Sequence, residues 1–231
     1  MWWIGFSQIT FKYLPKDNKT VVGSNIITKG FREIKKVWYE LKSQGNTKKF
    51  LLAFFCYSAG VQTVLYMAST FADKELKFPA SELIAIIIIL QLVAIGGAYL
   101  FAHLSKLKGN KFSLIFMLVI WVIICIAAYA VNTKLQFYLL ASAVGMVMGG
   151  IQSLSRSTYS KLLPTNLHDT TSYFSFYDVL EKLAIVVGTF SFGFIENLTG
   201  GMRNSVLTLG LFFILGIIFI SKVKVPERSP A

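Results

Sequence analysis

Six long apolar runs divide this chain and decide which solvent it folds in. They cover residues 50–71, 83–104, 112–131, 135–154, 173–195 and 205–221. Each is about 20 residues long, the length that an α-helix needs to cross roughly 30 Å of hydrocarbon. Lipid offers no hydrogen-bond partner to a free backbone group, so spanning segments of this kind must be helices. The sequence therefore predicts an all-α polytopic membrane protein with six transmembrane helices.

The distribution of positive charge predicts how these helices are oriented. The chain carries 23 Lys and Arg against 11 Asp and Glu, and its net charge is +12. Ten of these cations lie in residues 12–49, whereas the loops on the opposite side hold only Lys74, Lys77, Lys134 and Arg203. Cytoplasmic loops of membrane proteins carry such an excess. We therefore expect cytoplasmic N- and C-termini in a bacterial plasma membrane with an anionic inner leaflet, and no nucleic-acid partner.

The first 49 residues differ in character from the rest of the chain. Residues 1–11 are apolar but too short to span, and we interpret them as the end of a preceding helix. Residues 12–49 form a cytoplasmic basic linker, in which Ile27, Phe31, Ile34, Trp38 and Leu41 fall on one helical face. This pattern predicts an amphipathic helix on the inner leaflet. The alternative is a linker helix whose stripe packs on neighbouring protein. Residues 50–225 form the transmembrane domain, and 226–231 a cytoplasmic tail.

Polar residues are distributed unevenly among the six runs. Runs 112–131 and 205–221 contain no charged or amide side chain and no histidine, whereas the other four carry Gln62, Gln91, Gln152, Asp178, Glu181 and Lys182. Burying such groups in lipid costs several kcal/mol unless they meet partners or water. We therefore expect the first, second, fourth and fifth helices to line an interior, and the third and sixth to face lipid.

Three of these polar residues are predicted to lie at a similar depth. Gln62, Gln91 and Lys182 fall near the membrane midplane, where secondary transporters place their substrate sites. Glu181 and Asp178 are candidates for proton coupling. Two simpler explanations remain open. A glutamine can join two helices by hydrogen bonds, and Asp178 and Lys182, spaced i,i+4, can neutralise each other.

Small and reactive residues give less specific signals. Gly145 and Gly149 are spaced for close helix packing, and we interpret Gly96, Gly97, Gly188 and Gly193 in the same way. Two cysteines within apolar runs (Cys56, Cys125) and two isolated histidines (His103, His168) have no metal-binding spacing. We expect no metal, no cofactor and no enzymatic activity, because no hydrolase or phosphate-loop motif is present in the sequence.

The most specific local string is GGIQSLSRSTYSKLLP, which runs from Gly149 to Pro164 at the end of the fourth run. It resembles the corresponding loop of the major facilitator superfamily branch that contains the fungal vacuole effluxers. Residues 60–67 and 172–188 are similar to neighbouring helices of the same branch. Residues 102–111 match the superfamily's loop between its second and third helices at Gly109 and Lys111. Lys106 stands where that loop has Asp, which argues against a charge relay there.

The resemblance implies the C-terminal six helices of a twelve-helix bundle. It adds Tyr66 to the substrate-binding candidates, and it implies a gate or inner-loop motif at Gln152, Ser155, Arg156, Gly109 and Lys111. The implied function is secondary active transport of a small polar solute, with amino acids as the first guess, by ion- or proton-coupled alternating access. The implied partner is the missing N-terminal half or a second copy of the chain. The alternative is a non-transporting half-bundle, truncated or from a split gene, that acts as a membrane scaffold.

Overall fold

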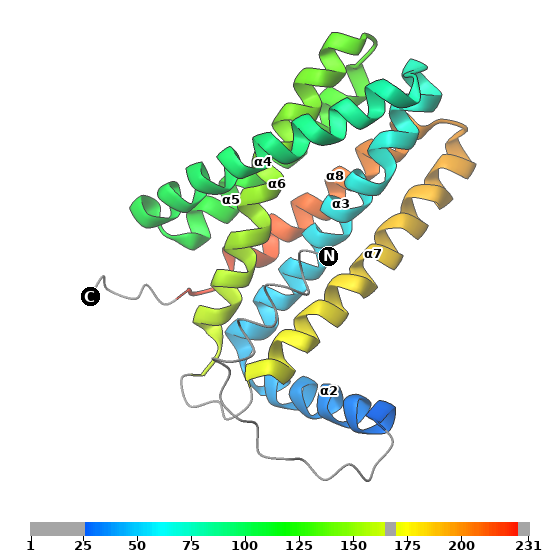
Figure 1. Ribbon diagram of the computed structural model, residues 1–231. Coiled ribbons are helices and arrows are strands. Elements are labelled where there is room, and N and C mark those ends of the chain that lie inside the picture. The colour runs from blue at the N-terminus through cyan, green and yellow to red at the C-terminus, as the bar shows by residue number, and fades with distance from the viewer. Residues whose placement is uncertain (1–25, 165–169, 226–231) are drawn as a thin grey trace, which may run out of the picture. The chain divides into compact units, whose positions relative to one another are not determined.

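The computed structural model describes residues 26–164 and 170–225, and α-helices fill almost all of this part of the chain (Figure 1). The elements are α2 (Ile26–Ser43), α3 (Gly45–Leu76), α4 (Ala80–Lys108), α5 (Asn110–Ala130), α6 (Lys134–Leu162), α7 (Thr170–Thr199) and α8 (Met202–Ser221). The expected helix end at 1–11 and the tail at 226–231 lie outside the described residues.

The six predicted spans coincide with α3 to α8, so the predicted all-α polytopic architecture is confirmed. Five of these helices, α3, α4, α5, α6 and α8, are long and apolar enough to cross a membrane by length and composition. The sixth, α7, has 30 residues but carries Asp178, Glu181 and Lys182 within its apolar run. α7 is therefore the most polar of the six spans, and the structure must account for how its three charged side chains are accommodated.

Short turns join α3 to α4, α4 to α5 and α5 to α6. Lys77 ends α3 in the left-handed region (φ 53°), and the Phe78 N–H donates to the carbonyl of Ala72 at 3.2 Å. Gly109 (φ 82°) alone separates α4 from α5. Thr133 starts α6 with a capping box: its hydroxyl accepts from the Gln136 N–H, and the Gln136 amide oxygen accepts from the Thr133 N–H. These turns leave little freedom in how successive helices reverse direction.

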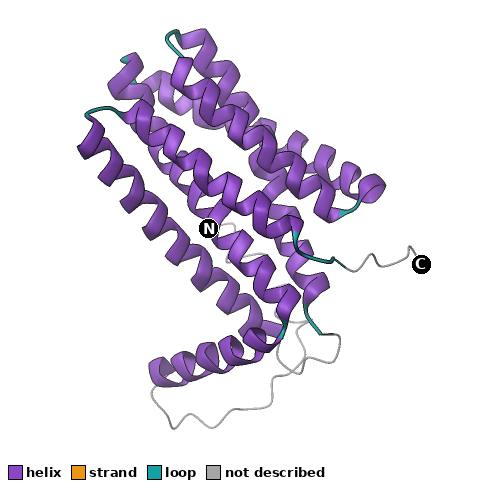
Figure 2. Cartoon of the chain, turned by 180° about the vertical axis from the view of Figure 1, so that it is seen from behind, coloured by secondary structure: helices purple, strands orange, loops and turns teal. Residues whose placement is uncertain are grey.

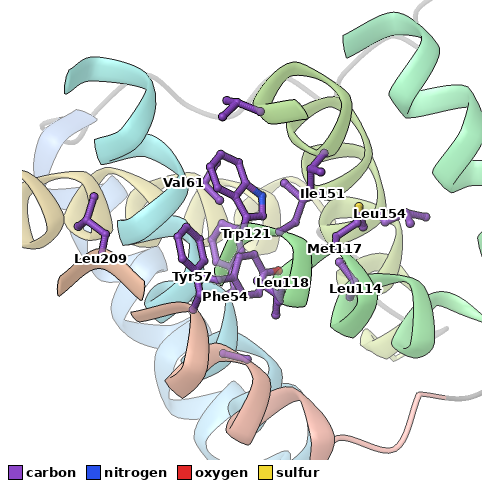
Figure 3. Close-up of a cluster of buried hydrophobic side chains, with 14 of the residues drawn as sticks. Phe54, Tyr57, Val61, Leu114, Met117, Leu118, Trp121, Ile151, Leu154 and Leu209 are labelled. Carbon is purple, nitrogen blue, oxygen red and sulfur yellow. The ribbon is translucent and has the colours of Figure 1, made fainter. Parts of the chain in front are cut away.

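The strongest packing joins helices that are distant in sequence (Figures 1 and 2). α3 lies against α7 and α8, α4 against α6, and α5 against both α6 and α8. Trp121 of α5 is fully buried and stacks on Phe213 of α8, with 5.2 Å between ring centroids. Figure 3 shows Trp121 among Tyr57 and Phe54 of α3, Leu118 of α5 and Ile151 of α6. The core therefore lies where α3, α5, α6 and α8 meet.

Glycines allow α4 and α6 to approach backbone to backbone. A Cβ atom at Gly97 would lie 1.9 Å from the carbonyl oxygen of Met146, and one at Gly149 would lie 2.1 Å from that of Ala94. Gly145 similarly approaches Leu90, and Gly188 of α7 approaches Thr63 of α3. The predicted packing role is confirmed at these positions. It is wrong for Gly96 and Gly193, where an added Cβ would meet nothing within 4 Å.

The lipid-facing surfaces agree only in part with the polarity of the runs. α5 and α8 expose apolar side chains along one face each, as expected. α4, however, is the least enclosed span, with only Ile86, Ala94, Gly97 and Phe101 buried among its 29 residues. Its Gln91 is exposed. The physical reason is that α4 packs mainly through its glycine-bearing face on α6, so the described part of the chain leaves its other faces uncovered.

The second half of α2 packs on the six-helix bundle. Val37 and Leu41 are buried, and the ring of Trp38 lies 6.0 Å from that of Phe176. The Tyr173 hydroxyl donates to a carboxylate oxygen of Glu40. For residues 34–43, the structure thus favours a stripe packed on protein. Residues 26–33 belong to a separate compact unit, and lipid contact of the helix stays a prediction.

Candidate functional site

A polar pocket lies between α3, α6 and α7, toward the ends where α3 and α7 begin and α6 finishes. Its cavity volume is about 110 Å³. The lining residues are Phe54, Tyr57, Ser58, Val61, Gln62, Ile151, Gln152, Ser155, Arg156, Tyr177 and Glu181. Amide, hydroxyl, guanidinium and carboxylate groups therefore meet in one hollow of a bundle that is otherwise apolar.

A hydrogen bond between α3 and α7 occupies one side of the pocket. The Gln62 side-chain amide donates to a carboxylate oxygen of Glu181, with an N···O distance of 2.6 Å. Both side chains are half-buried. A carboxylate at this depth is costly without a donor, and Gln62 supplies one while leaving the second carboxylate oxygen of Glu181 available.

An ion pair between α6 and α7 borders the same pocket. A terminal guanidinium nitrogen of Arg156 lies 2.6 Å from a carboxylate oxygen of Asp178, and about half of each side chain is exposed. The guanidinium also lies 5.5 Å from the centroid of the Tyr177 ring, within cation–π range. Asp178 thus pairs with Arg156 across two helices. Lys182, its i,i+4 neighbour, is exposed and forms no ion pair within residues 26–164 and 170–225.

A hydroxyl chain fixes the buried wall of the pocket. The Ser155 hydroxyl donates to the carbonyl of Ile151 one turn earlier, and the oxygens of Tyr57 and Ser155 lie 2.7 Å apart. Since the single Ser155 proton is already used, the Tyr57 hydroxyl is the donor to Ser155. This bond joins α3 to α6 and satisfies a tyrosine hydroxyl that is buried almost completely.

Stacked aromatic rings support the wall from behind. Phe54 lies parallel to Tyr177, with 4.0 Å between ring centroids, and Tyr159 lies 5.1 Å from Tyr177. Tyr159 is itself held by a hydrogen bond from its hydroxyl to the carbonyl of Tyr173. Aromatic pairs of this kind stabilise by about 0.5–1.5 kcal/mol beyond their buried area. These contacts buttress the buried wall of the pocket, whereas Arg156 and Asp178 border its exposed side.

The structure brings together only some of the residues predicted to form the site. Gln62, Gln152, Ser155, Arg156 and Glu181 line one pocket, and Asp178 reaches it through its ion pair. Three predicted substrate-binding residues do not line the pocket and lie on exposed surfaces: Tyr66 on α3, Gln91 on α4 and Lys182 on α7. Their contact with substrate stays a prediction.

The predicted loop residues Gly109 and Lys111 belong to a different polar cluster, at the turn between α4 and α5. Asn110 is its centre: its amide oxygen accepts from Ser105 at 2.6 Å and from Lys161 at 2.9 Å, and its amide nitrogen donates to Thr158 at 3.0 Å. Lys111 donates to the last helical carbonyl of α8, at Ser221. The turn is thus fastened to the ends of α6 and α8 without an acidic residue.

Two functional features were missed by sequence reasoning. Tyr57 and Tyr177 line the pocket, but tyrosines are common in these runs and gave no pattern. The sequence feature that could have identified them is their position within the apolar runs. Tyrosine is enriched at membrane interfaces, so a tyrosine far from the ends of a run needs a polar partner for its hydroxyl. Asn110 was overlooked beside Gly109, although an amide between two apolar runs must find buried partners or lie in water.

The chemical groups that line the pocket are complementary to those of a small polar molecule. Its carboxylate and amide oxygens suit an ammonium group, the Arg156 fork suits a carboxylate, and the rings of Tyr177 and Phe54 suit an apolar part. Among the described residues, no group of His, Cys, Asp and Glu is arranged to hold a metal ion.

Comparison with known proteins places this geometry in context. A family model described as "Vacuole effluxer Atg22 like" matches residues 1–229. The MFS-type transporter YxiO of Bacillus subtilis, itself uncharacterized, is 29% identical over 228 residues, which cover 99% of this chain and 52% of YxiO. Autophagy-related protein 22 of Kluyveromyces lactis is 28% identical over 196 residues, covering 78% of this chain and 39% of that protein. The Saccharomyces cerevisiae protein of the same name is 25% identical over 179 residues, covering 73% and 34%. The chain spans about half, or less, of the length of the curated relatives it matches.

Proposed function

The chain belongs to the family described as vacuole effluxer Atg22 like, and on this premise we propose that it forms half of a secondary active transporter. The observation that carries the proposal is the polar pocket, in which Gln62, Glu181 and Arg156 meet inside a bundle of apolar helices. Ionisable side chains within membrane-spanning helices are rare and mark the pathways of solutes and ions.

We propose a small polar solute as substrate, with amino acids as the first class to test. The support is chemical: a zwitterion needs an acceptor and a donor a few ångströms apart, and Glu181 and Arg156 lie in one pocket of about 110 Å³. We propose that Glu181 carries the coupling proton, because its carboxylate lines the pocket and has the Gln62 amide rather than a cation as its hydrogen-bond partner. Asp178, held by Arg156, then closes the pocket on one side.

The proposed transporter works by alternating access and needs a second six-helix bundle. The exposed sides of Arg156, Asp178 and Gln152 leave the pocket open on a face that residues 26–164 and 170–225 do not cover. We propose that the missing N-terminal half, or a second copy, covers it in a bacterial plasma membrane with both termini in the cytoplasm. Tyr66, Gln91 and Lys182 would then face the substrate across that interface.

The test of coupling is uptake of radiolabelled amino acids into proteoliposomes with and without an imposed pH gradient. Glu181→Gln keeps a side chain of the same shape that can still form hydrogen bonds, but it removes the ionisable carboxylate. We therefore expect gradient-driven uptake to fall at least tenfold, while exchange at equal pH persists. The matched control is Glu82→Gln, an exposed carboxylate that pairs with Lys134 at the opposite end of the bundle, and it should leave uptake unchanged. Gradient-driven uptake that persists in Glu181→Gln would exclude the proposed role of Glu181 in proton coupling.

A non-transporting half-bundle remains the second candidate, favoured by the one-sided opening of the pocket. The mass of the detergent-solubilised particle separates the two. A complex with a second six-helix bundle supports transport, whereas a stable monomer that binds no amino acid supports a scaffold.

A further inference from the structure

A second cavity, separate from the polar pocket, lies toward the opposite ends of the same helices. Its volume is about 140 Å³. All six helices of the bundle contribute to it, through buried side chains that include Ala72, Ile86, Ala128, Ala141, Phe192 and Leu209, one from each helix in chain order. A molecule in this cavity would therefore contact every helix of the bundle.

The two cavities are separated along each shared helix. The two linings share no residue, and on α7 their nearest members are Glu181 and Phe192, whereas on α3 they are Gln62 and Val64. On α6 they are Ile151 and Val144, so at about 1.5 Å per residue the gap is roughly 3 Å on α3, 10 Å on α6 and 16 Å on α7. The second cavity is thus no extension of the polar pocket, and none of its lining residues carries a charge.

The lining excludes water as the natural occupant. A buried water needs two to four polar partners, and the one polar side chain that lines the cavity, Ser69, is exposed at its edge. A cavity of similar size, about 150 Å³ and lined by Leu, Ile and Phe, stays dry in another protein and binds benzene or xenon. The cavity between the six helices has a similarly apolar lining.

Aromatic side chains narrow the choice of ligand. Phe71 and Phe137 both line the cavity, with ring centroids 6.2 Å apart and ring planes inclined by 14°. Rings of this kind favour a further ring in offset or edge contact. We propose that this cavity is a binding site for a small apolar molecule with one aromatic ring, which reaches it from the bilayer and stabilises the bundle by touching all six helices.

The experiment is thermal unfolding of the purified chain in detergent, with and without toluene. We expect toluene to raise the unfolding midpoint by about 2–4 °C. Ala141→Leu places an isobutyl group in the cavity, so this variant should lose the toluene shift. Ala102→Leu adds the same group on an exposed face of α4 and should keep it. Toluene partitions equally into the micelles of all variants, so micelle effects cancel in the comparison.

No shift in the wild type, or an undiminished shift in Ala141→Leu, would overturn the proposal. If Ala141→Leu does not fold, Val144→Ala replaces it, because this change enlarges the cavity from α6. The shift given by the bulkier p-xylene should then exceed its shift in the wild type, and equal shifts would overturn the site. Neither measurement depends on transport, so its failure leaves the proposed function untouched.

Discussion

Asn110 is a buried amide that joins three helices at one end of the bundle. Only 5% of it is exposed, and it connects Ser105 at the end of α4 with Thr158 and Lys161 at the end of α6. Three partners for one side chain make the turn between α4 and α5 a fixed point.

We predict that Asn110→Ala destabilises the chain by about 2–3 kcal/mol, because it removes three hydrogen bonds and leaves the Thr158 hydroxyl short of a donor. The thermal unfolding midpoint in detergent should fall by about 5–10 °C. Asn204→Ala, at an exposed position on α8, should leave it within about 1–2 °C of the wild type. Equal midpoints for the two variants would show that the turn is held by other contacts.

Individual residues of the site could be predicted where burying their polar side chains costs free energy. Gln62 and Glu181 were predicted because a polar group in an apolar run demands an explanation, whereas Arg156 was predicted from the family resemblance of residues 149–164. Their partners were not predictable: Asp178 has Lys182 one turn away on its own helix, yet it pairs with Arg156 of α6. The rule of i,i+4 neighbours describes one helix, whereas this pair is set by how α6 and α7 pack.

Helix α4 is held to α6 through one glycine-bearing face, and adjacent glycines on α4 have opposite environments. Gly97 meets the backbone of Met146, whereas Gly96 points into open space. The sequence places both in an apolar run with no difference between them. Helical periodicity alone cannot say which face meets a neighbour when nearly every face is apolar.

We predict opposite effects for Gly97→Ala and Gly96→Ala. The Cβ at position 97 would lie 1.9 Å from a backbone oxygen, so α4 and α6 must separate, and the unfolding midpoint should fall by about 5 °C or more. At position 96 the methyl group meets nothing, and the better helix propensity of alanine should leave the midpoint unchanged or raise it by about 1–3 °C. A similar fall in both variants would contradict the close contact of these two helices.

The presence of each helix could be predicted from the sequence, whereas the residues at which the helices begin and end were less predictable. The apolar run 50–71 became α3, Gly45–Leu76, because a helix continues past the hydrocarbon until a cap stops it, here at Lys77. The exposure of α4 was not foreseen, since Gln91 suggested a buried face. An apolar composition indicates that a segment lies in an apolar environment. It does not indicate how much of the helix surface contacts lipid and how much contacts protein.

We predict the orientation of the bundle in the membrane from its basic residues. Lys106, Lys108 and Lys111 cluster around the turn between α4 and α5, whereas the turn between α3 and α4 lies at the other end of α4. The positive-inside rule predicts that the first of these turns faces the cytoplasm.

Cysteine labelling in intact cells tests this orientation. In a background with Cys56→Ser and Cys125→Ser, Lys108→Cys should resist a membrane-impermeant maleimide until the cells are opened. Lys77→Cys, at the turn after α3, should react at once. The reverse pattern would mean that the bundle is inserted upside down and that the polar pocket opens toward the outside.

The position of α8 has a consequence for how the chain is made. α8 leaves the ribosome after the other five helices of the bundle, yet it packs against both α3 and α5: Phe213 meets Gly60 and Trp121, and Gly216 meets Tyr57. Until α8 emerges, the rings of Tyr57 and Trp121 lack their contacts with it. The six-helix bundle is therefore completed only after the 20 residues of α8 have been made and inserted.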